Sequence, residues 1–409
     1  MHGPAVFRCA GSGSAFRRIL LFNVLGCLLL QGRAVPADDI KRIEPDTTAG
    51  TASAVVVSGG GLLHTTQIFP AADALSLSVS DQFGNVVSQM TNTISQSGAS
   101  EIVKLNLYVV SDAAAAEVLQ TLPAHFPDGQ QPAVAVVVSS LPVKGALVAA
   151  DAVAFIDAQQ AKSVQRSSQA AVLPEGSRIY ISGQAHQSAS LGEATAGTLL
   201  SLHKTLEFLG RSDDDIVQLK AFVEPMSDHA VVSAEVTKFF HGRTVPPLVL
   251  VEWKSSKTVP VEIELIAVGG AFNPGAPAME FLTPPDMTAS PVYCRVCRIN
   301  SPGLIYVSGL YSQHDTVAHP QRDGNGDMEV LSVFESLERI LKQAGSDFQH
   351  LAKATYYVAT DSTSASLNTL RPKYYDPMRP PAASKAAVTS VGRPEFGLTL
   401  DMIAVPATP

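Results

Sequence analysis

Segments in which apolar and polar residues alternate predict strands along this chain, and segments with apolar residues at helical spacing predict helices between them. The clearest unit runs from about 166 to 272. In it, Leu199, Leu202 and Leu206 mark one apolar face of a helix, and Gly210 follows at the position of a C-cap. The predicted order is strand 178–184, helix 191–209, strand 216–223, helix 227–240, strand 248–253 and strand 261–268.

The same order recurs twice, which makes an internal repeat the strongest signal in the sequence. After residue 300 it predicts strand 304–309, helix 327–344, strand 351–358, helix 363–371 and strand 398–405. Before residue 160 a fainter copy predicts strand 62–67, helix 81–97, strand 101–109 and strand 147–154. Each copy has about 110 residues, enough for a core of its own. We therefore expect an α+β protein of three tandem βαβ units, each with two helices packed on one face of a mixed sheet.

The first 37 residues have the pattern of a secretory signal peptide. Three arginines precede an apolar run over 19–30, and small residues at 34–37 offer a cleavage site. The run is too short to span a bilayer. The alternative is a buried N-terminal helix. The signal predicts an exported protein, periplasmic or extracellular, with no membrane partner once the signal is removed.

Composition and charge narrow the class of protein. Hydrophobic residues make up 46% of the 409 residues and charged residues 16%, which excludes a disordered chain. The net charge is −8, and loss of the four arginines in 1–37 takes it to −12. Proteins that bind nucleic acid through its phosphates usually present a basic surface, so we expect no nucleic-acid partner.

Two cysteines remain after residue 37, in the stretch Tyr293-Cys-Arg-Val-Cys-Arg298. A C-x-x-C motif in an exported protein suggests a disulfide or a redox pair. However, residues 291–299 have the pattern of a strand, in which positions three apart lie about 10 Å from each other. A disulfide needs Cα atoms within about 7 Å, so we expect Cys294 and Cys297 to be free thiols. A single C-x-x-C is weak evidence for zinc.

Three stretches stand out: Tyr-Ile-Ser-Gly-Gln at 180–184, Leu-Pro-Val-Lys-Gly-Ala-Leu-Val at 141–148, and Val-Glu-Ile-Glu-Leu-Ile-Ala-Val at 261–268. They resemble the RidA family, also called the YjgF or L-PSP endoribonuclease family. The resemblance extends over 40–157, which is a degenerate copy, 160–270 and 285–407. It implies a chorismate-mutase-like fold for each unit.

Members of that family are homotrimers with a ligand cleft at each subunit interface, and known members hydrolyse enamines and imines to ketones and ammonia. Three fused copies therefore imply an intrachain pseudo-trimer that is a monomer and binds a small molecule at its interdomain clefts. A physical reason supports this arrangement. A sheet with helices on one face needs its other face covered, and two sister units can cover it.

The family's carboxylate-binding arginine is missing from all three copies. The resemblance aligns it with Val134, Leu248 and Ala383. A hydrophobic residue cannot hold a carboxylate in the way a guanidinium does. Lys385 lies two residues after Ala383, on the same strand face, and is a candidate substrate-binding residue; the alternative is a solvated surface lysine.

The resemblance also implies an acid on the last strand of each unit, which orients or activates water. We match it to Asp151, Glu264 and Asp401, which become the candidate catalytic residues. Glu264 is flanked by Ile263 and Leu265, and burial in such a run would raise the pKa of a carboxyl group and suit it to proton transfer. The alternative is that these acids face solvent or form structural ion pairs.

The Ser-Gly step at the end of the first strand supplies the remaining candidates. In the family its backbone approaches the ligand closely, which glycine permits. The matching substrate-binding candidates are Ser182, Gly183, Gln184, Ser308 and Gly309. An ordinary strand-end glycine is the alternative.

The sequence has few signals for other kinds of catalytic or metal-binding site. We expect the loop histidines His186, His314 and His319 at the surface, and His64 packed inside a strand after a hairpin turn at 59–61. No metal motif, nucleophile elbow or phosphate loop is present, so we expect neither metal nor cofactor.

Three functions remain open at this point. The first is an enamine or imine deaminase acting at the clefts, on a substrate without a carboxylate. The second is a non-catalytic small-molecule-binding or scaffold protein. The third is a ribonuclease, which the net charge disfavours.

Overall fold

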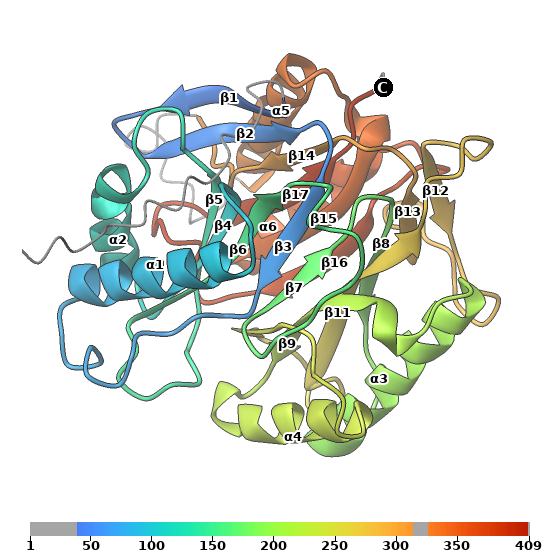
Figure 1. The fold of residues 1–409 in the computed structure, drawn as a ribbon, viewed down its shortest axis with the longest axis horizontal. Coiled ribbons are helices and arrows are strands. Elements are labelled where there is room, and N and C mark those ends of the chain that lie inside the picture. Colours follow the sequence, from blue (N-terminus) through green and yellow to red (C-terminus); the bar gives the residue numbers. More distant parts are fainter. Residues whose placement is uncertain (1–38, 314–325, 408–409) are drawn as a thin grey trace, which may run out of the picture. The chain divides into compact units, whose positions relative to one another are not determined.

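A computed structural model describes residues 39–313 and 326–407. The predicted signal peptide at 1–37 and His314 and His319 lie outside the described residues. The chain forms three mixed sheets with helices between their strands (Figure 1).

The first sheet has five strands and the other two have six. The first sheet has the order β5 (Ala133–Val138), β4 (Ile102–Val109), β6 (Val148–Ile156), β3 (Gly61–Thr65), β7 (Ala170–Leu173). The second has the order β10 (Leu248–Glu252), β9 (Ile216–Val223), β11 (Val261–Gly270), β8 (Ser177–Gln184), β13 (Val296–Ile299), β12 (Met279–Leu282). The third has the order β1 (Ile40–Asp46), β2 (Thr51–Val57), β14 (Leu304–Val307), β17 (Leu398–Ala404), β15 (Leu351–Val358), β16 (Ala382–Ala387).

The repeat predicted from the sequence is confirmed in the strand pairing. Each sheet has one parallel strand pair, and its other pairs are antiparallel. The parallel pairs are β4 with β5, β9 with β10 and β15 with β16. Helices connect the strands in the same places, α1 (Val79–Gln96) and α2 (Asp112–His125), α3 (Leu191–Phe208) and α4 (His229–Phe239), α5 (Gly326–Gln343) and α6 (Asp361–Leu370). The three units thus form an α+β intrachain pseudo-trimer.

Local sequence explains the ends of the first helix of each unit. Ser78 and Ser190 accept hydrogen bonds from the first turns of α1 and α3, which satisfies donors that the helix cannot. Gly98, Gly210 and Gly345 follow the ends of α1, α3 and α5 with φ of +77°, +66° and +77°. Glycine adopts this left-handed conformation without the strain that a side chain adds.

Neighbouring sheets exchange strands. β2 and β3 are joined by only three residues, yet β2 pairs with β1 and β14, whereas β3 pairs with β6 and β7. In the same way β7 and β8 lie in different sheets, as do β13 and β14. Figure 1 shows β2, in blue, beside β14, in orange. The hairpin turn expected at 59–61 is therefore wrong, because this segment connects two sheets.

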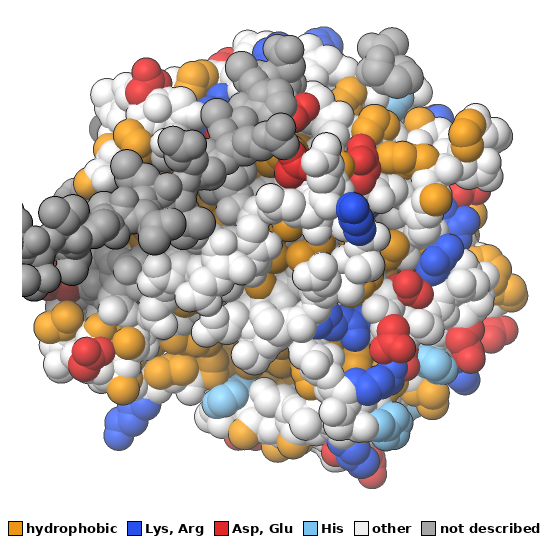
Figure 2. Space-filling view, in the orientation of Figure 1, with side chains coloured by type: hydrophobic (Ala, Val, Ile, Leu, Met, Phe, Trp, Pro, Cys, Tyr) orange, Lys and Arg blue, Asp and Glu red, His pale blue; other side chains and the backbone are white. Residues whose placement is uncertain are grey.

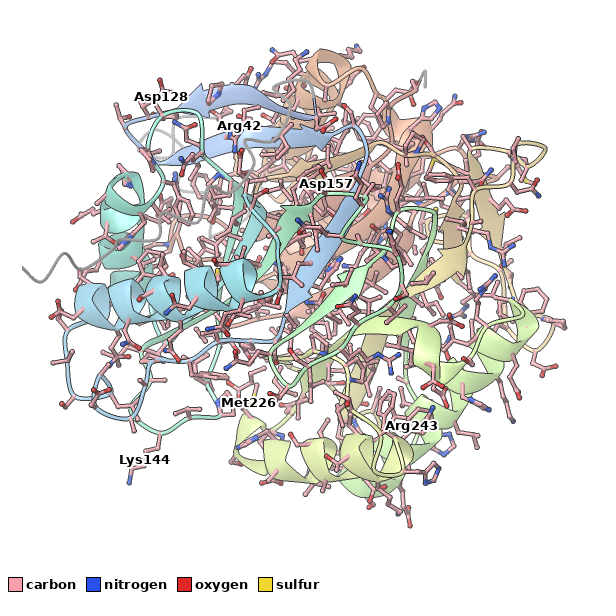
Figure 3. The ribbon with its side chains drawn as sticks, viewed as in Figure 1. Arg42, Asp128, Lys144, Asp157, Met226 and Arg243 are labelled. Carbon is pink, nitrogen blue, oxygen red and sulfur yellow. The ribbon has the colours of Figure 1, made fainter. Side chains whose placement is uncertain are left out.

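Polar side chains also join the exchanged strands to the neighbouring unit. Arg42 on β1, labelled in Figure 3, donates to the Glu101 carboxylate over 2.8 Å and to the Gln131 carbonyl over 3.0 Å. Both acceptors flank strands of the first sheet, while β1 belongs to the third. The two sheets are therefore linked by a charged side chain as well as by the backbone.

Each sheet has one face toward its two helices and one face toward the other sheets. In β17, Leu400 and Met402 belong to the core under α5 and α6. Ile403 belongs to a second core, shared by all three units, in which it joins Tyr180 and Tyr306. The alternation of strand side chains thus sends Asp401 to the shared side. This confirms that the sister units cover the second face of each sheet.

The two cysteines agree with the expectation of free thiols. Cys294 and Cys297 are both buried and unpaired, and both lie in the shared core. Burial raises the pKa of the Cys294 thiol to about 12. Neither thiol has the lowered pKa of a redox-active cysteine.

Candidate functional site

The Ser182-Gly183 step ends β8 beside β16 of the third unit. The Ser182 hydroxyl donates to the Cys294 carbonyl over 2.5 Å and accepts the Ala383 amide over 2.7 Å. The Gly183 amide donates to the Ser384 hydroxyl over 3.1 Å. The step therefore lies at an interface between units, next to the position where the resemblance expects an arginine and the chain has Ala383.

The Ser308-Gly309 step makes the equivalent contacts with the first unit. The Ser308 hydroxyl donates to the Ala52 carbonyl over 2.6 Å and accepts the Val134 amide over 2.7 Å. The Gly309 amide donates to the Val134 carbonyl over 2.7 Å. At both interfaces the serine hydroxyl is thus used between strands of neighbouring units.

The third interface, at Thr66-Gln67, is closed by the same kind of contact. Thr66 donates to the Leu248 carbonyl over 3.0 Å. The Gln67 amide group exchanges two hydrogen bonds with the backbone of Leu250, at 3.1 and 3.2 Å. This interface has neither the glycine of the other two steps nor an arginine.

Glu262 is the acid that lies at the Ser182-Gly183 interface. A Cβ added at Gly183 would overlap the Glu262 carboxyl group, so the two groups are in contact. Ser384 donates a hydrogen bond to this carboxylate. Burial, with the nearby charge of Glu264, raises the pKa of Glu262 to about 7, while Ser384 and Arg295 act in the opposite direction.

Sequence reasoning missed Glu262 because it chose the acid two residues further along β11. Positions two apart on a strand face the same side, so the pattern alone did not separate Glu262 from Glu264. What distinguishes Glu262 from Glu264 is its position relative to the end of the neighbouring strand, β8. Ile263 pairs with Gln184, which places Glu262 level with the end of β8, where Gly183 lies.

The three acids predicted as catalytic do not lie in three separate clefts. The structure brings them together on the shared side of the sheets, each at most 5% exposed. Three equally buried lysines surround them. The group, which we call the central charge cluster, consists of Asp151 on β6, Glu264 on β11, Asp401 on β17, Lys104 on β4, Lys220 on β9 and Lys353 on β15.

Ion pairs in the central charge cluster run between sheets. Lys104 of the first sheet lies 3.2 Å from Asp401 of the third, and Lys220 of the second lies 3.5 Å from the same residue. Lys353 of the third sheet lies 2.8 Å from Glu264 of the second. The cluster therefore joins all three units at the centre, which is the structural alternative we left open for these acids.

Asp151 has a different environment from the other two carboxylates. Its oxygens accept the Tyr108 hydroxyl at 2.7 Å and the Asn106 amide at 3.1 Å. Burial raises the pKa of Asp151, opposed by the charge of Lys220 and by these hydrogen bonds. Burial would also raise the pKa of Asp401, but Lys104, Lys220 and Lys353 outweigh it and hold that pKa below its usual value.

The remaining candidates are placed as follows. The Lys385 ammonium donates to Ser364 and Asn368 on α6, at 3.1 and 3.0 Å, so it is engaged at the surface. The Gln184 amide donates to Thr205 on α3 over 2.9 Å. His64 is fully buried, as expected for a packed residue.

Two larger cavities open at the surface. One, of about 420 Å³, is lined by Ser308 and Gly309 together with β1, β2 and Arg393. The Arg393 guanidinium lies 4.6 Å above the ring of Tyr311. The other, of about 400 Å³, lies between α3 and the segment 284–287 and includes His186. Both volumes are in the range of small-molecule sites.

Within residues 39–313 and 326–407, no three metal-binding side chains converge. None of the helices described there is long and apolar enough to cross a bilayer. On the face in Figure 2, Lys and Arg side chains lie among Asp and Glu rather than together.

Comparison with known proteins identifies the family. The family described as Endoribonuclease L-PSP matches residues 158–269 and 286–406, more than half of the chain. The chain therefore belongs to this family, for which RidA and YjgF are other names. A search of curated proteins found no match.

Several solved structures are similar to parts of the chain. The Escherichia coli YjgF gene product is 32% identical over 23% of this chain and 81% of its own, with a TM-score of 0.22. E. coli TdcF with bound serine is 27% identical over 23% and 81%, with a TM-score of 0.22. The Rid-family protein YyfB from Yersinia pestis is 22% identical over 29% and 99%, with a TM-score of 0.26.

Proposed function

We propose that this protein hydrolyses a small imine or enamine to a carbonyl compound and ammonia at the interface of β8, β11 and β16. The supporting observation is the contact of the Glu262 carboxyl with Gly183 and its hydrogen bond from Ser384. The glycine lets the two groups approach, and Ser384 fixes the carboxyl. A carboxyl group held at this interface between units supports the proposal.

The reaction needs one group that first accepts a proton and later donates it. An enamine first takes a proton on its β-carbon and becomes an iminium ion. Water then adds to the C=N carbon, and the nitrogen leaves as ammonia while the C=O bond forms. Glu262 takes the proton from the attacking water and returns it to the departing nitrogen. A carboxyl group with a pKa near 7 is suited to both steps at neutral pH.

The substrate class follows from the missing arginine. Ala383 cannot bind a carboxylate, and Lys385 is directed to α6. The substrate is therefore an imine without an α-carboxylate. The chain acts as a monomer, since its three units cover one another; a sedimentation mass of three chains would contradict this.

The experiment is ammonia release from freshly generated imines with and without an α-carboxylate. Glu262→Gln should reduce the rate by about 10²–10⁴-fold. The matched control is Glu175→Gln, because Glu175 is exposed and precedes β8 at the end opposite to Ser182-Gly183. Equal rates in the two variants would contradict the role of Glu262.

A second function is favoured by a different observation. The serine hydroxyls of both Ser-Gly steps are already hydrogen-bonded between strands, while the 420 Å³ cavity carries a guanidinium on Arg393. Glu44 and Asp46 line the same cavity, so this combination fits binding of a small polar molecule without turnover. Release of no ammonia from any imine, with ligand binding lost in Arg393→Met, would decide for this function.

A further inference from the structure

A small cavity lies at the centre of the molecule, inside the central charge cluster. Its volume is about 30 Å³, room for one halide ion or about two water molecules. Strands of all three sheets contribute to its wall. The polar lining consists of the six charged residues of the cluster with His64, Asn106, Gln218 and Tyr306.

The lysines of the cluster offer more N–H groups than the carboxylates accept. An ammonium group carries three donors. Lys353 uses two, on Glu264 and Thr355, at 2.8 and 2.7 Å. Lys220 has a carboxylate oxygen only at 3.5 Å, longer than a normal hydrogen bond. Donors therefore remain at the cavity, and they require an acceptor.

The ion pairs of the cluster are unevenly shared among its three carboxylates. The three lysines form ion pairs with only two of the three carboxylates, because Lys104 and Lys220 share Asp401. Asp151 is instead held by a phenol and an amide. The three lysines hold the pKa of Asp401 below its usual value against the effect of burial. Burial would lower the pKa of Lys220, but the phenols and carboxylates around it outweigh burial and raise that pKa well above its usual value.

Neutral groups on the wall also lack partners. Gln218 lies beside the imidazole of His64, yet neither ring nitrogen reaches a partner at hydrogen-bonding geometry within the described residues. The Tyr306 hydroxyl has only the equally buried Tyr180 hydroxyl beside it. Buried polar atoms are almost always hydrogen-bonded, and exceptions indicate a water or an ion that completes the site. His64 is fully buried and lines the cavity.

We propose that the cavity binds one monovalent anion of the size of chloride. The anion accepts hydrogen bonds from Lys220 and from an N–H of His64. The site is distinct from the clefts at Ser182-Gly183 and Ser308-Gly309, and it holds the three units together.

The direct test replaces chloride by bromide in crystals of the whole protein and locates bromide by its anomalous scattering. The expected result is a single peak in the cavity, next to Lys220 and His64. In solution, the melting temperature should rise with sodium chloride and saturate, relative to sodium gluconate at equal ionic strength. No peak in the cavity, or a peak without this chloride-specific rise, would overturn the proposal and leave water or an adventitious ion only.

A variant locates the effect. Lys220→Gln should lose at least tenfold in apparent chloride affinity in the melting assay, whereas Lys238→Gln, on the exposed surface of α4, should match the original chain. An unchanged chloride response in folded Lys220→Gln would contradict the site. If Lys220→Gln does not fold, the bromide experiment on the original chain decides alone.

Discussion

The ammonium group of Lys353 lies 2.8 Å from a carboxylate oxygen of Glu264, and the two residues come from different sheets, β15 and β11. Both side chains are buried, at 8% and 4% exposure. An ion pair in such a place is costly to desolvate, but removing one partner costs more, because the other charge is left uncompensated. The pair therefore ties the second and third units together in a way that single substitutions can measure.

We expect Lys353→Met to lower the free energy of unfolding by about 3–5 kcal/mol. The double variant Lys353→Met/Glu264→Leu should recover most of this loss, since no unpaired charge remains. Urea unfolding followed by circular dichroism measures both. A double variant no more stable than Lys353→Met would show that the buried carboxylate is not the cause.

His64 makes stability depend on pH. Burial, and then the charge of Arg178, lower the pKa of His64 from 6.5 to about 3. Between these values the unfolded chain takes up a proton that the folded chain refuses, so stability falls as the pH falls. The slope from this residue is at most about 1.4 kcal/mol per pH unit.

The measurement is the difference between the original chain and His64→Leu in unfolding free energy from pH 7 to pH 4. Other groups also titrate here, and the raised pKa of Glu262 acts with the opposite sign. Their contributions cancel in the difference. We expect the loss of stability on acidification to be smaller in His64→Leu. Parallel curves for the two chains would contradict a neutral, buried His64.

Gly183→Ala tests the proposed proton-transfer site without changing an ionisable residue. An added Cβ would overlap the Glu262 carboxyl group and displace it from Ser384. We expect hydrolysis to fall at least tenfold with a small change in melting temperature. Gly59→Ala is the control, because a Cβ there meets only a side-chain oxygen at 3.8 Å. Full activity in Gly183→Ala would show that this contact is not needed.

The thiols of Cys294 and Cys297 should resist alkylation in the folded protein. Both lie in the shared core, and burial raises the pKa of each, so almost no thiolate forms at neutral pH. Mass spectrometry of the peptide that contains them, after iodoacetamide treatment with and without urea, measures this. Labelling at equal rates in both conditions would contradict the burial.

Most of the secondary structure could be predicted from the sequence, because long amphipathic patterns and helix-end glycines such as Gly98 and Gly210 are local signals. The exchange of strands between neighbouring sheets could not be predicted from the sequence. A three-residue connection at Ser58–Gly60 is compatible with a hairpin, and only the pairing of β2 with β14, about 250 residues away, shows otherwise. Pairing partners depend on tertiary structure, which alternation does not encode.

The candidate site, too, could be predicted from the sequence only in part. The sequence left open whether Asp151, Glu264 and Asp401 are buried or face solvent, and it did not show that the inner faces of three sheets meet. The lysines that accompany them were missed, since a lysine in a strand pattern usually faces solvent. Glu262 was missed because two acids on one strand face look alike until the end of the neighbouring strand is known.

The pairing of β2 with β14 also has a consequence during synthesis of the chain on the ribosome. Ala52 and Ser308, which share a hydrogen bond, are separated by 256 residues. At about 5–20 residues per second, β2 waits roughly 13–50 s for its partner. Its apolar edge is an open template for pairing with other chains during that time. Nascent chains that stop before Leu304 never cover this edge, and they are the species that should aggregate.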